Sequence, residues 1–494
     1  MFEFKSISNI KTNVEAAPVR SKFGQASVTA DNIVAIIPRG EVIRNFIYTG
    51  ALDEVAEKAN LSLISVSPSK SMNEMLRETY GDVHLLEEFD ERWIVRFQRE
   101  IIATAHNRWL WSKAAQERAR LRNAEARTIK QKAVWSIKKA VSYPLANRTG
   151  LNVLSAIERT SSRVFRTTDE YVKLMKKLAP ALVFNGSHIH SRVATQAVQA
   201  AQWLGIPTAT FIFSWDNLTS QGRIMLPYDY FLVWNETLKR QLLEMYEWIQ
   251  EEQVFVTGTP QFDFHFQPKF YQNRADFCCE IGADSSRPIV LYSTGMANHM
   301  PGEPEIVEEI ADMLKEIGGE NSPQLLVRVY PKDLTGRFDE LKGRRKDILF
   351  PSVAWEEGWQ TPKFEDSFAL VNTVRHADFG INVASTISLE LCMFDKPAIN
   401  VGYNPLSVDE KELSYATYYN FDHYRPVVES GAVEVAYNRE QMRTLVRQAI
   451  NEPSRRTNER KALINKMFGD TLDGNSAGRV ARVLLEIAAG EKRK

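Results

Sequence analysis

The chain has 494 residues, of which 44% are apolar and 25% charged, and this composition is typical of a globular protein and excludes disorder as its dominant state. One compact core is not expected at this length, so we expect two domains of roughly 200 to 250 residues each. Lys plus Arg and Asp plus Glu both number 62, so no overall charge favours nucleic acid as a partner.

The first half alternates strands and helices. A buried strand at 32–38 precedes the Arg39-Gly40 turn, a helical pattern begins near residue 41, and a second strand begins at Leu61. After an interruption the alternation resumes with strand 181–186 and ends with the run "QVFVTGTP". Short apolar runs separated by helical stretches indicate a parallel sheet. We therefore expect a Rossmann-like domain over residues 1–262.

The interruption is a helical stretch without Gly or Pro, from about residue 87 to 140. Its later part carries nine basic residues against Glu117 and Glu125, and Trp109, Trp111 and Trp135 flank it or lie within it. A basic helix with tryptophans can rest on an anionic membrane surface. A solvated helix face is the alternative, and the sequence leaves both open.

The second half repeats the alternation after a linker, with the strands "RPIVLYSTGM", "QLLVRVYP", "DFGINVA" and "PAINVG". It predicts a second Rossmann-like domain at 270–470, followed by a helical tail at 471–494. The expected fold class is α/β, with two doubly wound domains that face a central cleft and a long helical insertion in the first. Ligands of such folds bind at the carboxyl ends of the strands.

An anion site is predicted where "DFGINVA" meets the short helix that follows it. Ser385 and Thr386 lie at the start of this helix, where unpaired N–H groups favour a phosphate, and Glu390 lies one turn further on. A nucleoside diphosphate would fit this order of groups. The alternative is that Ser385 or Thr386 only caps the helix and Glu390 faces water.

Two other strand ends support an anion site. The small turn Ser293-Thr294-Gly295 follows one strand, while Arg328 lies within the next and Lys332 just after it. Hydroxyls, a helix start and cations in one crevice are typical of an anion site. We expect all of these residues to contact the same phosphate-bearing ligand, which is the donor in the reaction considered below.

The catalytic candidates are Asp216 and His188, which follow two strands of the first domain. As neighbours they would form a pair that tunes the imidazole pKa toward neutral pH, although a turn at Asp216 and an ordinary loop histidine are the alternatives. His188 and His190 lack a third ligand nearby, so no metal site is predicted. The acceptor-side candidates also follow first-domain strands: Arg39, Gly40, Asn185, Ser214 and Asn217.

The segments "VFVTGTPQFD", "VLYSTG", "VRVYPKD" and "INVASTISLELCMFDKPAINV" resemble, in this order, the donor domain of glycosyltransferases of the GT-B type. They are also similar to CDP-glycerol glycerophosphotransferases and bacterial capsule-polysaccharide transferases. The resemblance covers most of residues 180 to 470. It departs at Tyr330-Pro331, where many relatives have His-Pro.

The resemblance implies a role for each donor-side group. Ser293 and Thr294 would approach the donor phosphates, Ser385 and Thr386 the diphosphate, and Glu390 the ribose hydroxyls. The last helix, from about Ser476, would return to the first domain.

The expected function is a glycosyltransferase that moves a sugar from a UDP-, GDP- or CMP-linked donor to a polysaccharide or glycolipid acceptor. No Asp-x-Asp triplet occurs, so we expect a metal-independent reaction that requires no cofactor. The alternatives are a CDP-alcohol polyol-phosphate transferase, a nucleotide-sugar epimerase, or a noncatalytic scaffold of a glycan assembly complex.

The N-terminus lacks a hydrophobic signal core, and no apolar run of about 18 residues occurs. Only three cysteines are present, Cys278, Cys279 and Cys392, which favours a reducing compartment. We expect a cytoplasmic protein, with a possible place at the inner face of the membrane.

Overall fold

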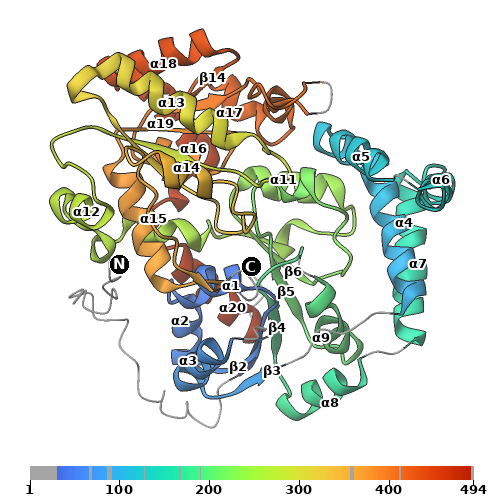
Figure 1. Ribbon diagram of the computed structural model, residues 1–494. Coiled ribbons are helices and arrows are strands. Elements are labelled where there is room, and N and C mark those ends of the chain that lie inside the picture. The colour runs from blue at the N-terminus through green and yellow to red at the C-terminus, as the bar shows by residue number, and fades with distance from the viewer. Residues whose placement is uncertain are drawn as a thin grey trace, which may run out of the picture.

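The computed structural model contains two parallel sheets and a helical arm (Figure 1). It describes residues 31–65, 69–85, 92–126, 128–165, 168–189, 191–356, 361–410 and 413–490. None of the helices within these ranges combines the length and the apolar character that a membrane span needs.

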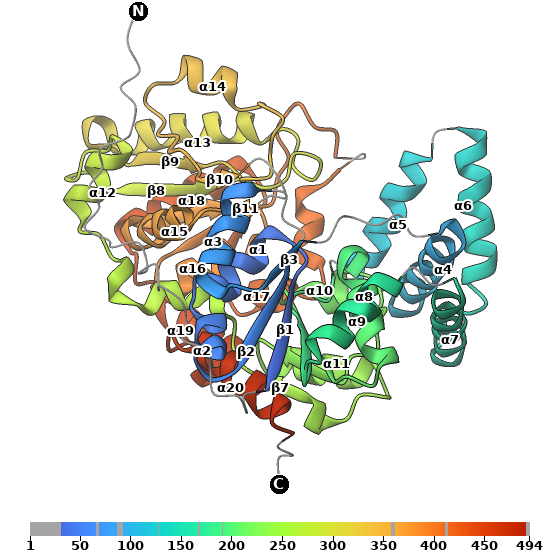
Figure 2. The same cartoon turned by 90° about the horizontal axis from the view of Figure 1, so that it is seen from below.

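The first sheet has the order β3-β2-β1-β4-β5-β6-β7 among the described residues, with every pair parallel. Its strands are short apolar runs that are largely buried, because helices cover both faces. Figure 2 shows α2 and α3 on one side of this sheet and α8 and α9 on the other. The strands are β1 (Asn32–Ile37), β2 (Asn60–Ser65), β3 (Val83–Leu85), β4 (Leu182–Asn185), β5 (Thr208–Phe211), β6 (Tyr230–Val233) and β7 (Val254–Val256). The helices are α2 (Ala51–Lys58), α3 (Lys70–Tyr80), α8 (Asp169–Leu178), α9 (Ser191–Trp203) and α11 (Glu236–Met245).

The second sheet has the order β14-β13-β12-β8-β9, again parallel, and Leu349 forms a single parallel bridge beside β9 at Leu326. Both sheets thus follow the doubly wound order, and the predicted fold class is confirmed. The strands are β8 (Ile289–Ser293), β9 (Gln324–Arg328), β12 (Phe379–Asn382), β13 (Ala398–Val401) and β14 (Val433–Ala436). The helices are α12 (Arg274–Ile281), α13 (Glu303–Gly318), α14 (Asp339–Arg344), α15 (Phe364–His376), α16 (Ile387–Met393), α17 (Arg425–Glu429) and α18 (Arg439–Asn451).

The end of the chain connects the two halves. Helix α19 (Thr457–Phe468) packs on α16, and α20 (Ser476–Ala488) packs on α2 and β4 of the first sheet. The carboxylate of Asp263 accepts hydrogen bonds from the backbone N–H groups of Ser476 and Ala477, at 3.1 and 2.8 Å. This caps the N-terminus of α20, and burial raises the pKa of Asp263 to about 6. One hydrophobic core therefore includes residues of both halves.

The interruption of the first half forms a separate helical arm, residues 92–165, beside the body of the protein (Figures 1 and 2). It contains α4 (Trp93–Leu110), α5 (Lys113–Glu125), α6 (Ile129–Ser142) and α7 (Arg148–Val164). Side chains of Ser112, Thr128 and Asn147 cap the last three helices and so divide the stretch.

The arm departs from the sequence-based expectation at its far end. The sequence predicts an insertion that ends at about residue 140, whereas α7 continues the arm to Val164 and α8 begins at Asp169. The insertion is therefore longer than predicted. Two ion pairs hold it together: Arg99 contacts the buried Glu158 of α7 at 2.8 Å, and Lys138 of α6 contacts Glu100 at 2.5 Å.

His106 in α4 gives a test of how the arm is packed. Its ring is fully buried near Trp109 and Tyr246, and neither ring nitrogen has a hydrogen-bond partner among the described residues. Burial, together with the charge of Arg223, lowers the pKa of His106 to about 3. In the unfolded chain the imidazole of His106 is protonated below about pH 6.5, whereas in the folded chain it stays neutral down to its lowered pKa. Between these two pH values the free energy of unfolding therefore falls by about 1.4 kcal/mol per pH unit of acidification.

We expect His106→Phe to remove this penalty. Urea unfolding of the wild type and the variant at pH 7.5 and pH 5 measures it: the loss of stability on acidification should be about 2 kcal/mol smaller in the variant. Equal losses in both proteins would contradict the neutral, buried state of the ring.

Candidate functional site

Each sheet reverses its strand order at one point, between β1 and β4 in the first domain and between β8 and β12 in the second. The registers place Ile36 beside Asn185 in the first sheet, and Ser293 beside both Asn382 and Arg328 in the second. Ligands of doubly wound sheets bind outside the carboxyl ends of the strands at such points. The predicted site residues all lie at or near these two edges.

Contacts between the two domains bring the edges together. The indole N–H of Trp215 donates to the hydroxyl of Thr386 at 3.1 Å, and the ring of Trp215 packs edge-on against His423 at 5.4 Å. The Thr219 hydroxyl lies 3.3 Å from Nδ1 of His423. Thr386 at the start of α16 therefore faces the loop after β5 of the first domain.

A buried network of side chains shapes the turn after β12. Asn382 binds the backbone N–H of Ser385, and Asn400 binds that of Ala384, both at 3.0 Å. The hydroxyl of Ser388 lies between these two amides, so it supports the turn from inside. Ala384 has a φ of 44°, a left-handed conformation that costs a non-glycine residue about 1 kcal/mol or more. The backbone N–H groups of Ala384 and Ser385 are thus already hydrogen-bonded to side chains of the protein. The hydroxyl of Thr386, in contrast, lies in the seam between the domains.

Glu390 is only 7% exposed and faces the segment that connects the two domains. Its Oε2 lies 2.7 Å from Nε2 of His265, in the 3-10 helix η3 (Pro260–Phe266). The alternative that Glu390 faces water is therefore wrong. A ribose contact by Glu390 stays a prediction, and it would be made beside His265.

The Ser293-Thr294-Gly295 turn is also held from inside the protein. The Thr294 hydroxyl accepts the backbone N–H of Tyr330 at 2.8 Å, and the N–H of Gly295 donates to the carboxylate of Glu303 at 2.9 and 3.1 Å. Burial raises the pKa of Glu303 to about 7, although Arg337 opposes this shift. Of the three predicted residues, Thr294 is buried, whereas Ser293 and Gly295 are partly exposed at this edge.

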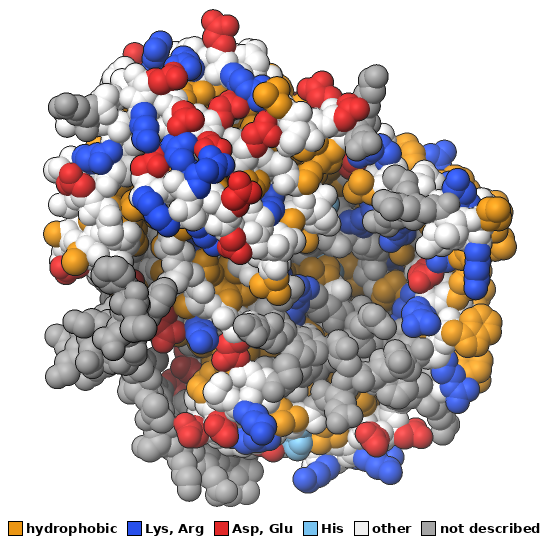
Figure 3. Space-filling model, in the orientation of Figure 1, with side chains coloured by type: hydrophobic (Ala, Val, Ile, Leu, Met, Phe, Trp, Pro, Cys, Tyr) orange, Lys and Arg blue, Asp and Glu red, His pale blue; other side chains and the backbone are white. Residues whose placement is uncertain are grey.

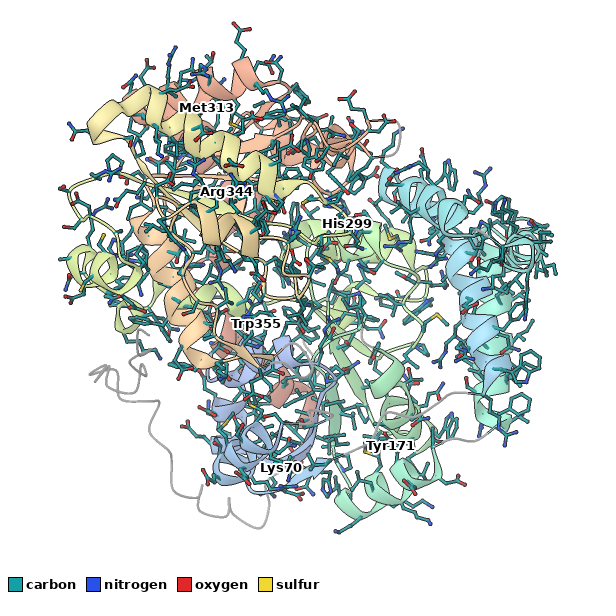
Figure 4. All side chains as sticks on the ribbon, in the orientation of Figure 1. Lys70, Tyr171, His299, Met313, Arg344 and Trp355 are labelled. Carbon is teal, nitrogen blue, oxygen red and sulfur yellow. The ribbon has the colours of Figure 1, made fainter. Side chains whose placement is uncertain are left out.

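Arg328 is not available as a free cation, contrary to expectation. One guanidinium nitrogen contacts both carboxylate oxygens of the buried Asp366, at 2.9 and 3.0 Å. Trp355 donates to the same carboxylate at 2.7 Å and lies where the second domain meets the first (Figure 4). The pair fixes α15 to β9, because a buried arginine needs a carboxylate partner.

Lys332 instead joins a cation cluster between the domains. Its ammonium group contacts Glu41, and Arg39 contacts the other oxygen of Glu41 at 2.8 Å. Burial lowers the pKa of Lys332, while Glu41 opposes this shift, and the charges of Arg39 and Arg44 also reach this point. We call Arg39, Arg44, Lys332 and Glu41 the interdomain cation cluster; it has three cations and one carboxylate.

The sequence-based prediction missed two members of this cluster, Glu41 and Arg44. The signal was present, because both follow the end of β1 at the point where the strand order reverses. Gly40 has a packing role here: a Cβ at this position would lie 2.2 Å from Oγ1 of Thr361 in β11 (Thr361–Pro362). A glycine lets α1 (Gly40–Val42) approach the second domain.

Two of the acceptor-side candidates support their own loops. The fully buried Asn185 donates to Tyr228 at 2.7 Å and to the carbonyl of Ser187 at 2.9 Å. Asn217 is buried and accepts the backbone N–H of Ser214 at 2.9 Å. These amide side chains position the strand ends, and Ser214 is partly exposed beside them.

The two catalytic candidates lie close together, but the expected tuning of the imidazole is wrong. Burial lowers the pKa of His188 to about 4, and this effect outweighs the opposing charge of Asp216. Nδ1 of His188 contacts the backbone of Phe211 and Phe213, at 3.3 and 3.4 Å. The ring is therefore neutral at pH 7, and a neutral imidazole can accept or relay a proton.

Asp216 is partly exposed and lies at the N-cap position, just before the short helix α10 (Asn217–Ser220). The hydroxyl of Ser220 donates to its Oδ2 at 2.5 Å. Its charge acts on His188, on His423 of the second domain and on Arg118 of the arm. Asp216 thus lies where all three parts of the protein meet.

The arm reaches the second domain through α5. The backbone N–H of Lys113 donates to Asp422 at 2.8 Å, and the charges of Glu117 and Arg118 act on His299. Figure 4 shows His299 on the side of the second domain that faces the arm, and Figure 3 shows the surface hollowed between the arm and the body. Arg118 belongs to the basic stretch for which the sequence left a membrane surface and a solvated helix face open, and in the structure the charge of Asp216 acts on it.

A separate hollow lies at the opposite edge of the first sheet. It has a volume of about 550 Å³ and is lined by Arg159 of α7 and Gln202 of α9, together with Pro207 and Tyr230 at the starts of β5 and β6. Ligands of doubly wound sheets bind at the carboxyl edge, so we do not assign the site to this hollow. His190 lies outside the described residues, and no group of three His, Cys, Asp or Glu suited to a metal ion occurs within those residues.

Two doubly wound domains whose carboxyl edges face each other define the GT-B fold, and this chain has that fold. No family model and no curated protein sequence matches the chain. Solved structures do match it. A UDP-GlcNAc 2-epimerase from Methanocaldococcus jannaschii has a TM-score of 0.51 and 15% identity, over 92% of this chain and 98% of that one.

Two further solved structures have the same arrangement. One is a UDP-GlcNAc 2-epimerase from Neisseria meningitidis bound to UDP-GlcNAc, with a TM-score of 0.50 and 13% identity over 92% of this chain and 99% of that one. The other is a glycosyltransferase from Rickettsia africae, with a TM-score of 0.50 and 12% identity over 93% and 99%. At these identities the similarity establishes the fold.

The interdomain cation cluster gives a stability prediction. Glu41→Gln leaves Lys332 and Arg39 without their carboxylate, and breaking a buried pair in this way costs about 3 kcal/mol. Urea unfolding measures the loss. The control is Glu247→Gln, which breaks the exposed Arg148–Glu247 pair and should cost less than about 1 kcal/mol. A similar loss in both variants would contradict a structural role for Glu41 between the domains.

Proposed function

We propose that the protein acts on a nucleotide-activated sugar bound between the two domains. The diphosphate would lie near Ser293, Gly295 and Thr386, and the ribose near Glu390. The supporting observation is that the reversal points of both sheets face each other, joined by the hydrogen bond between Trp215 and Thr386.

The interdomain cation cluster would stabilise the departing phosphate. Breaking the bond between the sugar and the diphosphate places negative charge on the leaving oxygen, and fixed cations lower the energy of that state. Arg39 and Lys332 lie at this edge, and their charges exceed that of Glu41. The protein would therefore bear the leaving-group charge with its own side chains.

Transfer of the sugar to an acceptor hydroxyl is the first candidate reaction. Asp216 would accept the proton of the hydroxyl, and Ser220 would hold the carboxylate in place. The arm favours this reaction, because α5 brings the charge of Arg118 within range of Asp216. A polysaccharide or glycolipid would be the acceptor.

Epimerisation of the nucleotide sugar is the second candidate, and the fold of the similar solved structures favours it. This reaction removes a proton from one sugar carbon and returns it to the other face, so it needs groups that exchange protons near the donor. Asp216 and the neutral His188 are suited to this. The product analysis described below also distinguishes the two remaining alternatives, a CDP-alcohol donor and a noncatalytic scaffold.

The donor assignment predicts the effect of Arg39→Ala on binding. Calorimetry with UDP, GDP, CDP and CMP should find one nucleoside diphosphate that binds, and the variant should weaken it by roughly tenfold, the loss of one charge-assisted contact. The matched control is Arg443→Ala, whose side chain is partly exposed on α18. Affinity unchanged in Arg39→Ala would contradict a diphosphate at the cation cluster.

The catalytic assignment predicts the effect of Asp216→Asn. Turnover should fall by about 10²- to 10⁴-fold while nucleotide affinity stays within about twofold. Ser220→Ala removes only the group that positions Asp216 and should have a smaller effect. Activity unchanged in Asp216→Asn would exclude this residue as the base.

Product analysis with a labelled donor separates the candidate reactions. Transfer releases a nucleoside diphosphate only when an acceptor is present, whereas epimerisation changes the sugar with donor alone. A released nucleoside monophosphate indicates a CMP- or CDP-linked donor, and nucleotide binding without any product supports the scaffold.

A further inference from the structure

Helix α6 of the arm carries its apolar residues on its outward face. Ile129, Val134, Ile137 and Val141 are between 41% and 89% exposed. At about 100° per residue they fall within an arc of about 140° of the helix. An amphipathic helix of a globular protein normally turns this arc to the core, so α6 has the reverse orientation.

The inward face of α6 is polar, and this fixes the orientation. Lys138 contacts Glu100 of α4 at 2.5 Å. The indole of Trp135 and the ammonium group of Lys139 both donate to Asn123 of α5, at 2.6 and 2.7 Å. Helix α6 therefore packs against α4 and α5 through these residues, and its apolar arc is left exposed.

Helix α7 extends the same kind of surface. Val153, Ile157 and Val164 are between 49% and 68% exposed and lie within about 40° of one another around the helix. Both α6 and α7 pack against α4. Figure 3 shows hydrophobic side chains interleaved with Lys and Arg along the outer edge of the arm.

The charge of this region has one sign. Residues 128–165 contain seven basic residues and one acidic residue, a net charge of +6, and the acidic Glu158 is buried against Arg99. Lys130 is exposed within the apolar arc of α6, and Lys132 is exposed about 60° outside the arc. Protein interfaces are depleted in lysine, whereas an anionic bilayer binds a surface that is both apolar and cationic.

We propose that the exposed apolar residues of α6 and α7, with Lys130 and Lys132, form a face that docks the arm on an anionic lipid bilayer. This α6–α7 face differs from the basic stretch that the sequence pointed to. In that stretch Arg120 is paired with Glu117, at 2.9 Å between Nε and Oε2, and the charge of Arg118 acts within the site. The inference does not depend on the reaction that the protein catalyses.

Flotation assays of the full chain test the proposal. The vesicles are phosphatidylcholine with about 30% phosphatidylglycerol, which makes them anionic. The double substitution Ile137→Glu and Val141→Glu should weaken binding by at least about tenfold, because two apolar side chains leave the interface. Lys130→Gln and Lys132→Gln should each weaken it by about fivefold, and less at high salt. The control is the double substitution Leu334→Glu and Leu406→Glu, with the same charge change at side chains that are 77% and 85% exposed in the second domain.

All of these side chains are exposed, so unchanged melting temperatures should show that the variants fold. Four results would overturn the proposal. The first is no binding to anionic vesicles, the second is binding that the α6 substitutions leave unchanged, and the third is binding that is as strong on pure phosphatidylcholine. The fourth is a dimer in light scattering that Ile137→Glu with Val141→Glu converts to a monomer, since the face would then join two copies of the chain.

Discussion

The hydrogen bond from Trp215 to Thr386 spans the seam between the two sheets, and the candidate site depends on it. Parallel sheets offer ligands only their carboxyl edges, so a site shared by two such sheets requires these edges to face each other at a fixed distance. Trp215 sets this distance on one side of the seam, and the contact of Lys332 with Glu41 sets it on the other. Helix α20 then holds the second domain against α2 of the first.

The strand ends carry two kinds of polar residue. Asn185, Asn382 and Asn400 are buried and satisfy backbone groups of the loops, since an unpaired buried amide would be costly. Asp216 and Thr386 lie in the seam, where a substrate could reach them. The first kind makes the second possible, because a loop without internal hydrogen bonds could not hold a reacting group in place.

The arm connects two surfaces of different chemistry. Its helix α5 brings Arg118 toward Asp216 and meets the second domain at Asp422, so its inner side belongs to the site. Its helices α6 and α7 turn apolar and basic side chains outward, away from the sheets. A protein with this arrangement would hold its site a fixed distance from whatever surface the arm binds, because the ion pairs of Glu100 and Glu158 make the arm one packed unit.

The sequence by itself determined the two doubly wound sheets, since apolar runs and helical periods are local patterns that helices and strands satisfy within a few residues. It also indicated the loops of the site, because polar residues at strand ends are visible along the chain. Only the tertiary structure decided which partner each of them meets. Arg328 pairs with Asp366, which is 38 residues away in the sequence. Glu390 pairs with His265 over 125 residues, and Lys332 pairs with Glu41 over 291 residues. The strength of a charge pair and the pKa of a buried group depend on distance and solvent exclusion in the folded chain. Neither distance nor solvent exclusion can be read from the order of the residues.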